Sequence, residues 1–496
     1  MRESAIFRHI RPPMKKTVTV LLLLCSVLPL AAQSRREALL EYGARRRQAY
    51  TEFRENYRKA CADFMRKRWE AFQAEAPVPV PQREEPDRPA VKPAGSPAAA
   101  TATPLPHLGT VTPPDRRTEP EPVTDTPAQT GGEPAIDTRR SCRFTFYGTE
   151  CSVSLPASAR FQLASLQEDA VADAWEAISR GTYDRAARES LDLKRQLRLN
   201  DWGYYRLAES IGDAHCGAGT DESVLVQSFL LAEAGYKIRL ARGDNRLRLL
   251  LAVGQRVYAR PYFQIDGEKF YLLDGKPRAA SYRICNFSIP GERVLSLAMP
   301  EPPRLAVKAA PATEHNDRAS GLQTNVSTNR NLIDFMADYP SCPWEVYAVT
   351  KLSEQTGSQL LPVLRQAIRG KEEREAAGIL LQYLQNAFSY MTDDAQFGDE
   401  RTFFCDEMFF YPHSDCEDRA ILYARLIREL LGLKTVLLYY PNHIATAVRF
   451  NREGWGDYVQ IDRDRYTICD PTYIGGEVGE AMPNLRKESA RIIPID

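Results

Sequence analysis

An internal repeat constrains the fold of this 496-residue chain more than any other feature. Residues 262–274 (YFQIDGEKFYLLD) align with residues 458–470 (YVQIDRDRYTICD), with five identities in thirteen positions. The helical pattern before each segment keeps its spacing too, with matched positions Asp221/Asp418, Leu225/Leu422 and Gly235/Gly432. A helix followed by hairpin strands, present twice in the same order, predicts a duplicated α+β domain.

Length and composition exclude two classes of protein. At about 100–200 residues per domain, the chain is long enough for two to four units. Its 43% hydrophobic content excludes disorder of the whole chain. No apolar run after residue 33 approaches the roughly 20 residues of a membrane span, so we expect no transmembrane span after that point. The 65 basic and 65 acidic residues cancel in total, but not segment by segment.

The N-terminus has the pattern of an export signal over 1–33. Residues 18–32 (VTVLLLLCSVLPLAA) form an apolar core behind Met14-Lys15-Lys16, which makes Met14 an alternative start. Leu24 precedes Cys25 where lipoprotein processing requires a small residue, so we expect a periplasmic or secreted protein without a lipid anchor. Nine cysteines remain after cleavage, and an odd number leaves at least one thiol unpaired in a monomer.

Two unlike segments follow the signal. Residues 35–76 predict one long basic amphipathic helix, with 11 Lys/Arg against 6 Asp/Glu between 35 and 72. We favour a helix that docks its aromatic stripe on another domain; a partner in the cell envelope is the alternative. Residues 77–138 hold 15 of the 34 prolines and predict a disordered Pro-rich linker.

The remaining chain predicts two globular domains, 139–300 and 331–496, joined by a polar linker over 301–330. Cys142 and Cys151 flank a hairpin at the start of the first domain and could form a disulfide. The second carries residues with catalytic potential. Cys416 lies in the first turn of a helix, where unpaired backbone N–H groups favour a thiolate. His443 begins a strand and Asp470 ends another.

Taken singly, each of these three residues has an ordinary structural explanation. A buried thiol, a strand histidine and a turn aspartate are common, so only their combination indicates catalysis. A thiolate nucleophile needs a base, and the imidazole needs an acceptor that orients it. His413 is a rival base, which we disfavour because it precedes the helix. We expect Cys405 to take no part.

One set of residues resembles the pattern of the transglutaminase-like superfamily. It consists of the motif Asp415-Cys416-Glu417-Asp418, followed by Gly432, His443 and Asp470-Pro471-Thr472. The whole layout is similar to exported transglutaminase-like proteins of Bacteroidetes-type bacteria. The resemblance is strong over 372–475 and weaker over 205–275. It implies two tandem papain-like α+β domains, the first degenerate. The interval of 27 residues from histidine to aspartate is longer than the family pattern, and a hairpin loop over 451–457 would absorb the excess.

The resemblance also implies roles for individual residues. Cys416 would attack a carbonyl, His443 would exchange protons and Asp470 would fix the imidazole. The backbone N–H of Cys416 is a candidate oxyanion donor. Asp415 would cap the helix, while Glu417 and Asp418 would brace it rather than react.

The first copy is expected to be inactive. With Asp221 aligned on Asp418, Gly219 falls at the nucleophile position, and a shift of one residue gives Thr220. The histidine position falls on 246–248, which holds arginines, and only Asp274 remains. No histidine lies between His215 and His315, so this copy is interpreted as a scaffold or substrate-binding domain.

The preferred function is hydrolysis of peptide or related amide bonds through a thioester, with a protein or peptide substrate. Three alternatives stay open: acyl transfer that cross-links proteins, a non-catalytic binding or scaffold protein of the cell envelope, and a surface assembly in which the basic helix and the linker are the functional parts. We expect no cofactor, no metal site and no nucleic-acid partner, because no motif for them rises above background. Acidic pairs such as Asp393-Asp394 are too common to indicate calcium.

Overall fold

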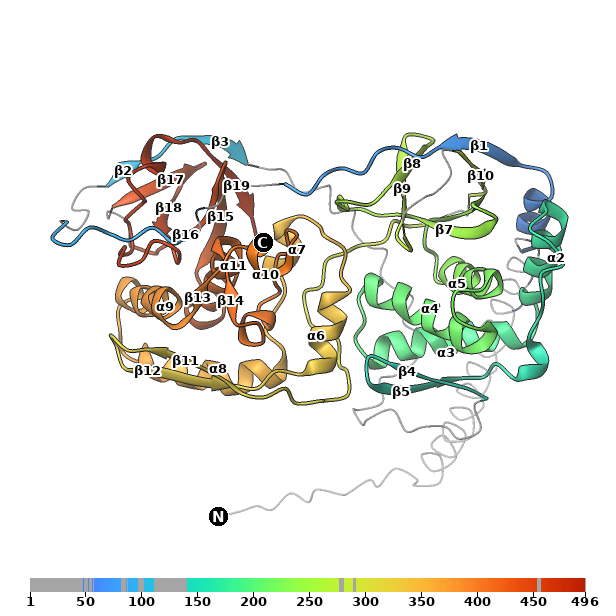
Figure 1. Cartoon of the computed structure of the whole chain (residues 1–496), viewed down its shortest axis with the longest axis horizontal. Helices are drawn as coiled ribbons and strands as arrows, with labels where there is room; N and C mark the ends of the chain where they lie inside the picture. Colours follow the sequence, from blue (N-terminus) through green and yellow to red (C-terminus); the bar gives the residue numbers. More distant parts are fainter. Residues whose placement is uncertain are drawn as a thin grey trace, which may run out of the picture. The chain divides into compact units, whose positions relative to one another are not determined.

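The computed structural model describes residues 58–81, 88–96, 102–110, 141–275, 281–288, 291–452 and 456–495, together with Gln48, Glu52, Asn56 and Pro86. The chain is a mixed α+β protein, as its sequence predicts (Figure 1). Residues 1–63 and 64–496 are two compact units. In the first, the described residues are helical, and the expected export signal lies outside them. Within the described ranges, no helix is long and apolar enough to cross a membrane.

The first half of the second unit is built on a six-stranded antiparallel sheet of order β1-β10-β6-β7-β9-β8. Its strands are β1 (Trp69–Gln73), β6 (Ile238–Gly243), β7 (Arg246–Ala252), β8 (Tyr262–Ile265), β9 (Glu268–Leu272) and β10 (Ser281–Cys285). Helices α3, α4 and α5 lie between this sheet and a hairpin of β4 and β5 (Figure 1). These elements and their neighbours are β4 (Cys142–Phe146), β5 (Thr149–Val153), η1 (Ala157–Ala159), α2 (Glu168–Ile178), α3 (Thr182–Gln196), α4 (Asp201–Cys216) and α5 (Asp221–Glu233).

The second half has a seven-stranded sheet of order β2-β17-β18-β16-β15-β19-β3. Its strands are β2 (Thr103–Pro104), β3 (His107–Thr110), β15 (Lys434–Tyr440), β16 (His443–Arg449), β17 (Asp457–Ile461), β18 (Asp464–Cys469) and β19 (Ala490–Pro494). The helices are α6 (Arg330–Ala337), α7 (Trp344–Ala348), α8 (Glu354–Ala367), α9 (Glu373–Ala387), α10 (Asp393–Phe397), α11 (Cys416–Leu431), η2 (Glu407–Phe409) and η3 (Leu485–Lys487). Two short pairs complete it: β11 (Thr313–Asp317) with β12 (Leu322–Val326), and β13 (Ser389–Tyr390) with β14 (His413–Ser414).

The two halves share their central topology. The order β8-β9-β7-β6-β10 in one sheet recurs as β17-β18-β16-β15-β19 in the other. Helix α5 precedes the first hairpin of its sheet, as α11 does in the second half. Hairpin β4/β5 packs on α4, and hairpin β11/β12 packs on α9. The repeat in the sequence therefore has a counterpart in the order and packing of the elements.

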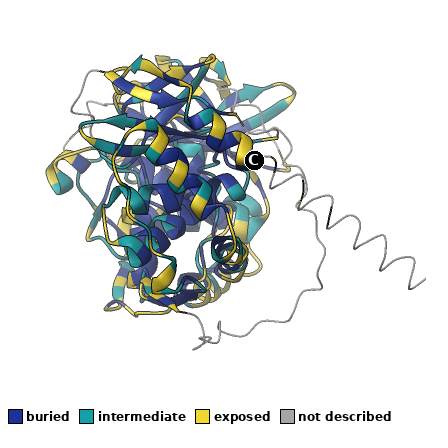
Figure 2. Cartoon of the chain, turned by 90° about the vertical axis from the view of Figure 1, so that its right-hand side faces the viewer, coloured by how far each residue is buried: buried dark blue, intermediate teal, exposed yellow. Residues whose placement is uncertain are grey.

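Helix α11 is the most deeply buried helix of the second half. Twelve of its sixteen residues are buried, so it is enclosed between the sheet and α9. A reciprocal capping box between Asp415 and Asp418 satisfies two backbone N–H groups at its start, and Gly432 ends it at φ 67°, a conformation that glycine adopts without strain. Figure 2 shows the general pattern, with buried residues inside and exposed ones at the surface.

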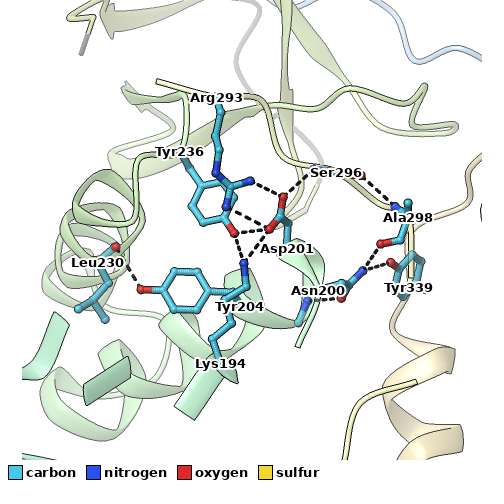
Figure 3. A network of polar contacts seen from close by, with 11 residues as sticks. Lys194, Asn200, Asp201, Tyr204, Leu230, Tyr236, Arg293, Ser296, Ala298 and Tyr339 are labelled. Atoms are coloured by element: carbon cyan, nitrogen blue, oxygen red, sulfur yellow. Dashed lines mark hydrogen bonds and ion pairs between the residues drawn. The ribbon is translucent and has the colours of Figure 1, made fainter. Parts of the chain in front are cut away.

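A buried ion network fixes the start of α4 to the segment that leads into the second half (Figure 3). Asp201 accepts hydrogen bonds from Lys194 (2.8 Å), Arg293 (2.7 Å) and the Ser296 N–H (3.1 Å). Burial alone would raise the pKa of Asp201, but the two cations together lower this pKa to about 2. The neighbouring Asn200 side chain reaches the second half, where it contacts the hydroxyl of Tyr339 at 2.6 Å.

The predicted helix over 35–76 is wrong at its C-terminal end. Residues 58–65 are helical, but Trp69–Gln73 form strand β1, which pairs antiparallel with β10. Phe72 packs against the apolar side of the first sheet. The aromatic spacing fits a helix or a strand, and pairing with an open sheet edge decides between them.

Two predicted linkers also contain ordered structure. Within 77–138, strands β2 and β3 pair with β17 and β19, so this chain segment covers both edges of the second sheet (Figure 1). Leu105 between them is buried in the core of that sheet. Within 301–330, residues 313–326 form hairpin β11/β12. In each case backbone pairing stabilises a polar or proline-containing sequence whose composition alone indicates a linker.

Candidate active site

Cys416 is the first residue of α11, where the sequence predicted it. Its Sγ accepts a hydrogen bond from the Ile444 N–H at 3.4 Å, so strand β16 begins beside the sulfur. The thiol also lies 3.5 Å from Glu417 Oε2, to which it can donate its proton. The first interaction stabilises negative charge on the sulfur, whereas a carboxylate at Glu417 stabilises the protonated thiol.

His443 and Asp470 form a direct pair. His443 Nε2 lies 2.9 Å from Asp470 Oδ2, so Nδ1 is the ring nitrogen that this contact leaves available. The Thr472 N–H donates to the other carboxylate oxygen, Oδ1, at 2.9 Å. The sequence predicts that Asp470 orients the imidazole, and the structure brings the two side chains together.

The sheet explains why His443 meets Asp470 and why Cys416 lies beside the start of the same strand. Strands β16 and β18 are antiparallel neighbours with Thr446 opposite Cys469, so the start of one strand lies beside the end of the other. His443 begins β16 and Asp470 follows β18 directly. The Thr446 hydroxyl donates to the Ala420 carbonyl of α11 at 3.0 Å and so ties that helix to the strand.

The three residues are almost fully enclosed. The exposed fractions are 1% for Cys416, 5% for His443 and 2% for Asp470. A nucleophile must come within about 3–3.5 Å of the carbon that it attacks. A substrate can therefore reach Sγ only after the surrounding side chains move.

A cluster of acidic side chains lies next to the thiol. Carboxylate oxygens of Asp393, Asp415 and Asp418 lie within 4.8 Å of one another, and Asp393 forms a second such group with Glu400 and Glu417. Burial, with repulsion from Glu417, raises the pKa of Asp393 and Asp418 well above their usual range. Of the residues that the structure describes, these acids are the ones that could hold a cation here; without one, the cluster retains a proton at neutral pH.

Gln385 supports the site, and sequence reasoning did not identify it. Its Nε2 on α9 donates to the carbonyls of Asp470 (3.2 Å), Tyr473 (2.8 Å) and Gly476 (3.1 Å), and its Oε1 accepts the Gly475 N–H (3.2 Å). A buried amide that holds the turn after Asp470 fixes the backbone that carries this carboxylate. A glutamine within an amphipathic helix gives no sequence signal for this role.

The structure gives the other sequence candidates different surroundings. His413 pairs with β13 through strand β14, and its Nδ1 has no hydrogen-bond partner among the described residues. Burial raises the pKa of the Cys405 thiol to about 12, which fits its expected lack of a role. Cys142 and Cys151 are both free thiols, because the strand register sets Cys142 opposite Val153 rather than opposite Cys151.

The first half has different side chains at the positions that correspond to the candidate site. The predicted alignment of the two halves is also wrong there by two residues. Thr220 caps α5 as Asp415 caps α11, so Asp221 takes the place of Cys416. Its carboxylate accepts the Leu247 N–H at 2.9 Å, as Cys416 Sγ accepts that of Ile444. The nucleophile position is therefore Asp221 and not Gly219 or Thr220.

Arginine replaces histidine in this half. Arg246 begins β7 as His443 begins β16, and its Nε lies 2.9 Å from Asp221. Asp274 keeps the position of Asp470 but pairs with Arg248 at 3.3 Å. His215 is buried on α4 and contacts the Tyr183 hydroxyl at 3.1 Å. An ion pair thus stands where the second half has a thiol and an imidazole.

No protein-family model, no curated protein and no solved structure matches this chain.

Proposed function

We propose that this protein is an exported thiol enzyme of the transglutaminase-like type, which hydrolyses peptide or related amide bonds through a Cys416 thioester. The observation that carries the proposal is the 2.9 Å contact between His443 Nε2 and Asp470 Oδ2, beside a cysteine in the first turn of a buried helix. The order of the three residues and the Asp415–Asp418 motif support it through their resemblance to that superfamily.

The proposed reaction gives each group one role. His443 Nδ1 takes the thiol proton, and Cys416 Sγ attacks the carbonyl carbon to form a tetrahedral intermediate. N–H groups in the first turn of α11 would stabilise its oxyanion. The imidazolium then gives its proton to the departing amine, which leaves a thioester. Water attacks the thioester with His443 as base, and this step releases the carboxylic acid and restores the thiol.

Two tandem transglutaminase-like domains are part of the proposal, with the first half as the degenerate one. The shared order of five strands supports this assignment, and so does the Asp221–Arg246 pair at the place of the thiol and imidazole. An ion pair offers no nucleophile that an adjacent base can activate, so the first half would act as a scaffold or in substrate binding.

A non-catalytic binding protein of the cell envelope is the second candidate. The burial of Cys416 and its contact with Glu417 favour it, because both disfavour a reactive thiolate in this conformation. The apolar residues 18–32 support an extracytoplasmic location in either case. Cross-linking differs from hydrolysis only in that an amine replaces water at the thioester.

Alkylation of the full chain with iodoacetamide, with each modified cysteine mapped by mass spectrometry, tests the proposal. We expect Cys416 to react fastest, this preference to disappear in His443→Ala, and Cys405→Ala to behave as wild type. Uniformly slow alkylation, or a disulfide at Cys416 in the native protein, would instead support the binding protein. For a labelled peptide substrate, release of an acid in water and of an amide with added amine separates hydrolysis from cross-linking.

A further inference from the structure

A segment from the N-terminal region binds the turn that follows Asp470. We define the clasp as residues 88–96 and 102–110. The Lys92 N–H donates to the Ile474 carbonyl at 2.9 Å, and the Ile474 N–H donates to the Ala90 carbonyl at 2.8 Å. These two backbone bonds connect the clasp to a residue only four positions after Asp470.

An ion pair strengthens this attachment. Lys92 Nζ lies 2.8 Å and 2.7 Å from the two carboxylate oxygens of Glu480. The side chains are only 15% and 6% exposed. Glu480 Oε2 also accepts the Glu477 N–H at 2.9 Å, so the carboxylate orders its own loop. Removal of the lysine would leave a buried charge without this cation, which is far more costly than the loss of a surface pair.

The clasp and α9 hold the same loop from different elements. Gln385 on α9 binds the carbonyls of Asp470, Tyr473 and Gly476, while the clasp binds Ile474 and Glu480. The loop also has no regular structure of its own across 470–480 apart from turns. Gly479 in this loop also bonds to the backbones of Ile468 and Asp457 in the neighbouring strands, so the clasp and α9 supply part of the contacts that fix the loop.

The second part of the clasp adds an apolar anchor. Leu105, 5% exposed, lies in one core cluster with Tyr473 and Met482. Strand β2 beside it forms a parallel pair with β17 over only two residues. A short pairing of this kind contributes little alone. The clasp is held as well by Leu105, by Lys92 and by the pairing of β3 with β19.

We propose that the clasp is a positioning element for the triad aspartate, with Lys92 as its anchoring residue. This inference rests on the proposed function, since it assigns a role within the same site. The contact between His443 and Asp470 requires that the carboxylate be held to within about 0.5 Å. Detachment of the clasp changes none of the three candidate residues. It removes a support of the loop that positions Asp470 against the imidazole.

The test compares Lys92→Met with wild type in the full chain. We expect the rate of iodoacetamide alkylation at Cys416 near pH 7 to fall about tenfold, and its pH profile to move toward that of an ordinary thiol with a pKa near 8.5. Hydrogen exchange should rise in residues 470–480 and stay unchanged in 416–431. Lys92→Arg, which keeps the charge, should restore both readouts. Lys371→Met, which removes an exposed pair with Glu375, is the matched control.

The outcomes separate the clasp from the function. Two results would overturn the clasp proposal. In the first, Cys416 of Lys92→Met is alkylated at the wild-type rate and with the wild-type pH profile. In the second, hydrogen exchange in this variant rises uniformly across the second half. If wild type shows no preference for Cys416, the proposed function fails, and exchange in 470–480 still decides whether Lys92 holds the loop. Should Lys92→Met fail to fold, Glu480→Gln provides the same comparison, because it weakens the pair from the other side.

Discussion

Arg246 pairs with Asp221 at 2.9 Å in the first half, at the place where His443 and Cys416 lie in the second. In each half one of these residues is the first of a strand and the other is the first of a helix. The backbone N–H that follows the strand residue binds the helix residue in each half. The same backbone frame thus holds an ion pair in one half and a thiol in the other.

Arg246→Met should lower stability without changing thiol reactivity. The arginine is 42% exposed, so solvent screens the pair and we expect a loss of about 1 kcal/mol or less in the free energy of unfolding. Urea denaturation measures this loss, and iodoacetamide alkylation measures the reactivity of Cys416. A large drop in that alkylation would show that the first half takes part in the chemistry.

Asp470→Asn should change the pH dependence of Cys416 more than it changes the fold. Asparagine keeps the shape of the side chain but removes the charge that stabilises an imidazolium at His443. We expect alkylation near pH 7 to fall on the order of 10²-fold and its midpoint to move to higher pH. Near-ultraviolet circular dichroism should match wild type. An unchanged midpoint would separate Asp470 from the thiol.

Asp201 should make the protein sensitive to acid. Its pKa of about 2 lies below the value of about 3.9 for an unfolded aspartate, so its carboxylate stabilises the fold above pH 4. This contribution, on the order of 2 kcal/mol, is lost as the pH falls from about 4 to 2. Denaturation measured across this pH range should show that the free energy of unfolding falls more steeply for wild type than for Asp201→Asn. Asp334→Asn, which removes an exposed pair with Arg330, should follow wild type.

Asp393 should have the opposite effect at higher pH. Burial raises the pKa of its carboxyl, so the folded state keeps a proton that the unfolded state loses above about pH 4. The resulting stabilisation is present at low pH and declines as the pH rises toward the folded pKa. Asp393→Asn keeps an acceptor for the Arg401 N–H. The free energy of unfolding of this variant, measured relative to wild type, should be higher at pH 8 than at pH 5. Asp394→Asn on the exposed side of α10 is the control, and an equal response in both variants would contradict the prediction.

The sequence indicates the positions of the three candidate residues because each lies at the boundary of a regular element. Cys416 follows a capping residue, His443 begins a strand and Asp470 ends one, and such boundaries leave a trace in the sequence. The contacts of Gln385 leave no such trace, because they depend on how α9 packs against a turn far away in the chain. Glu417 was expected only to brace α11, and its contact with the thiol depends on its rotamer.

The register of the first half differs from the predicted alignment for a physical reason. Alignment on identical aspartates places Asp221 on Asp418, although Asp221 is the first residue of its helix and Asp418 is the third. The capping residues Thr220 and Asp415 are the equivalent positions, since each side chain accepts an N–H three residues later. Residue identity misleads here, whereas the position of the helix N-cap does not.

Pairing between distant segments accounts for the other errors. Trp69–Gln73 and Thr103–Pro104 become strands only because β10 and β17 present open edges to them. Neither edge can be inferred from the local composition, which indicates a helix in one case and a linker in the other. The hairpin over 313–326 was missed because its polar residues lack clear alternation.

The pairing of Thr103 with Asp457 and of His107 with Ala490 has a consequence for biosynthesis. The ribosome makes the clasp early and the strands that receive it last. Until β17 and β19 are made the clasp lacks these partners, and the sheet of the second half reaches its full width only after β19 has emerged. A chain truncated before β19 would therefore leave β3 without its neighbour and open to pairing with other nascent chains.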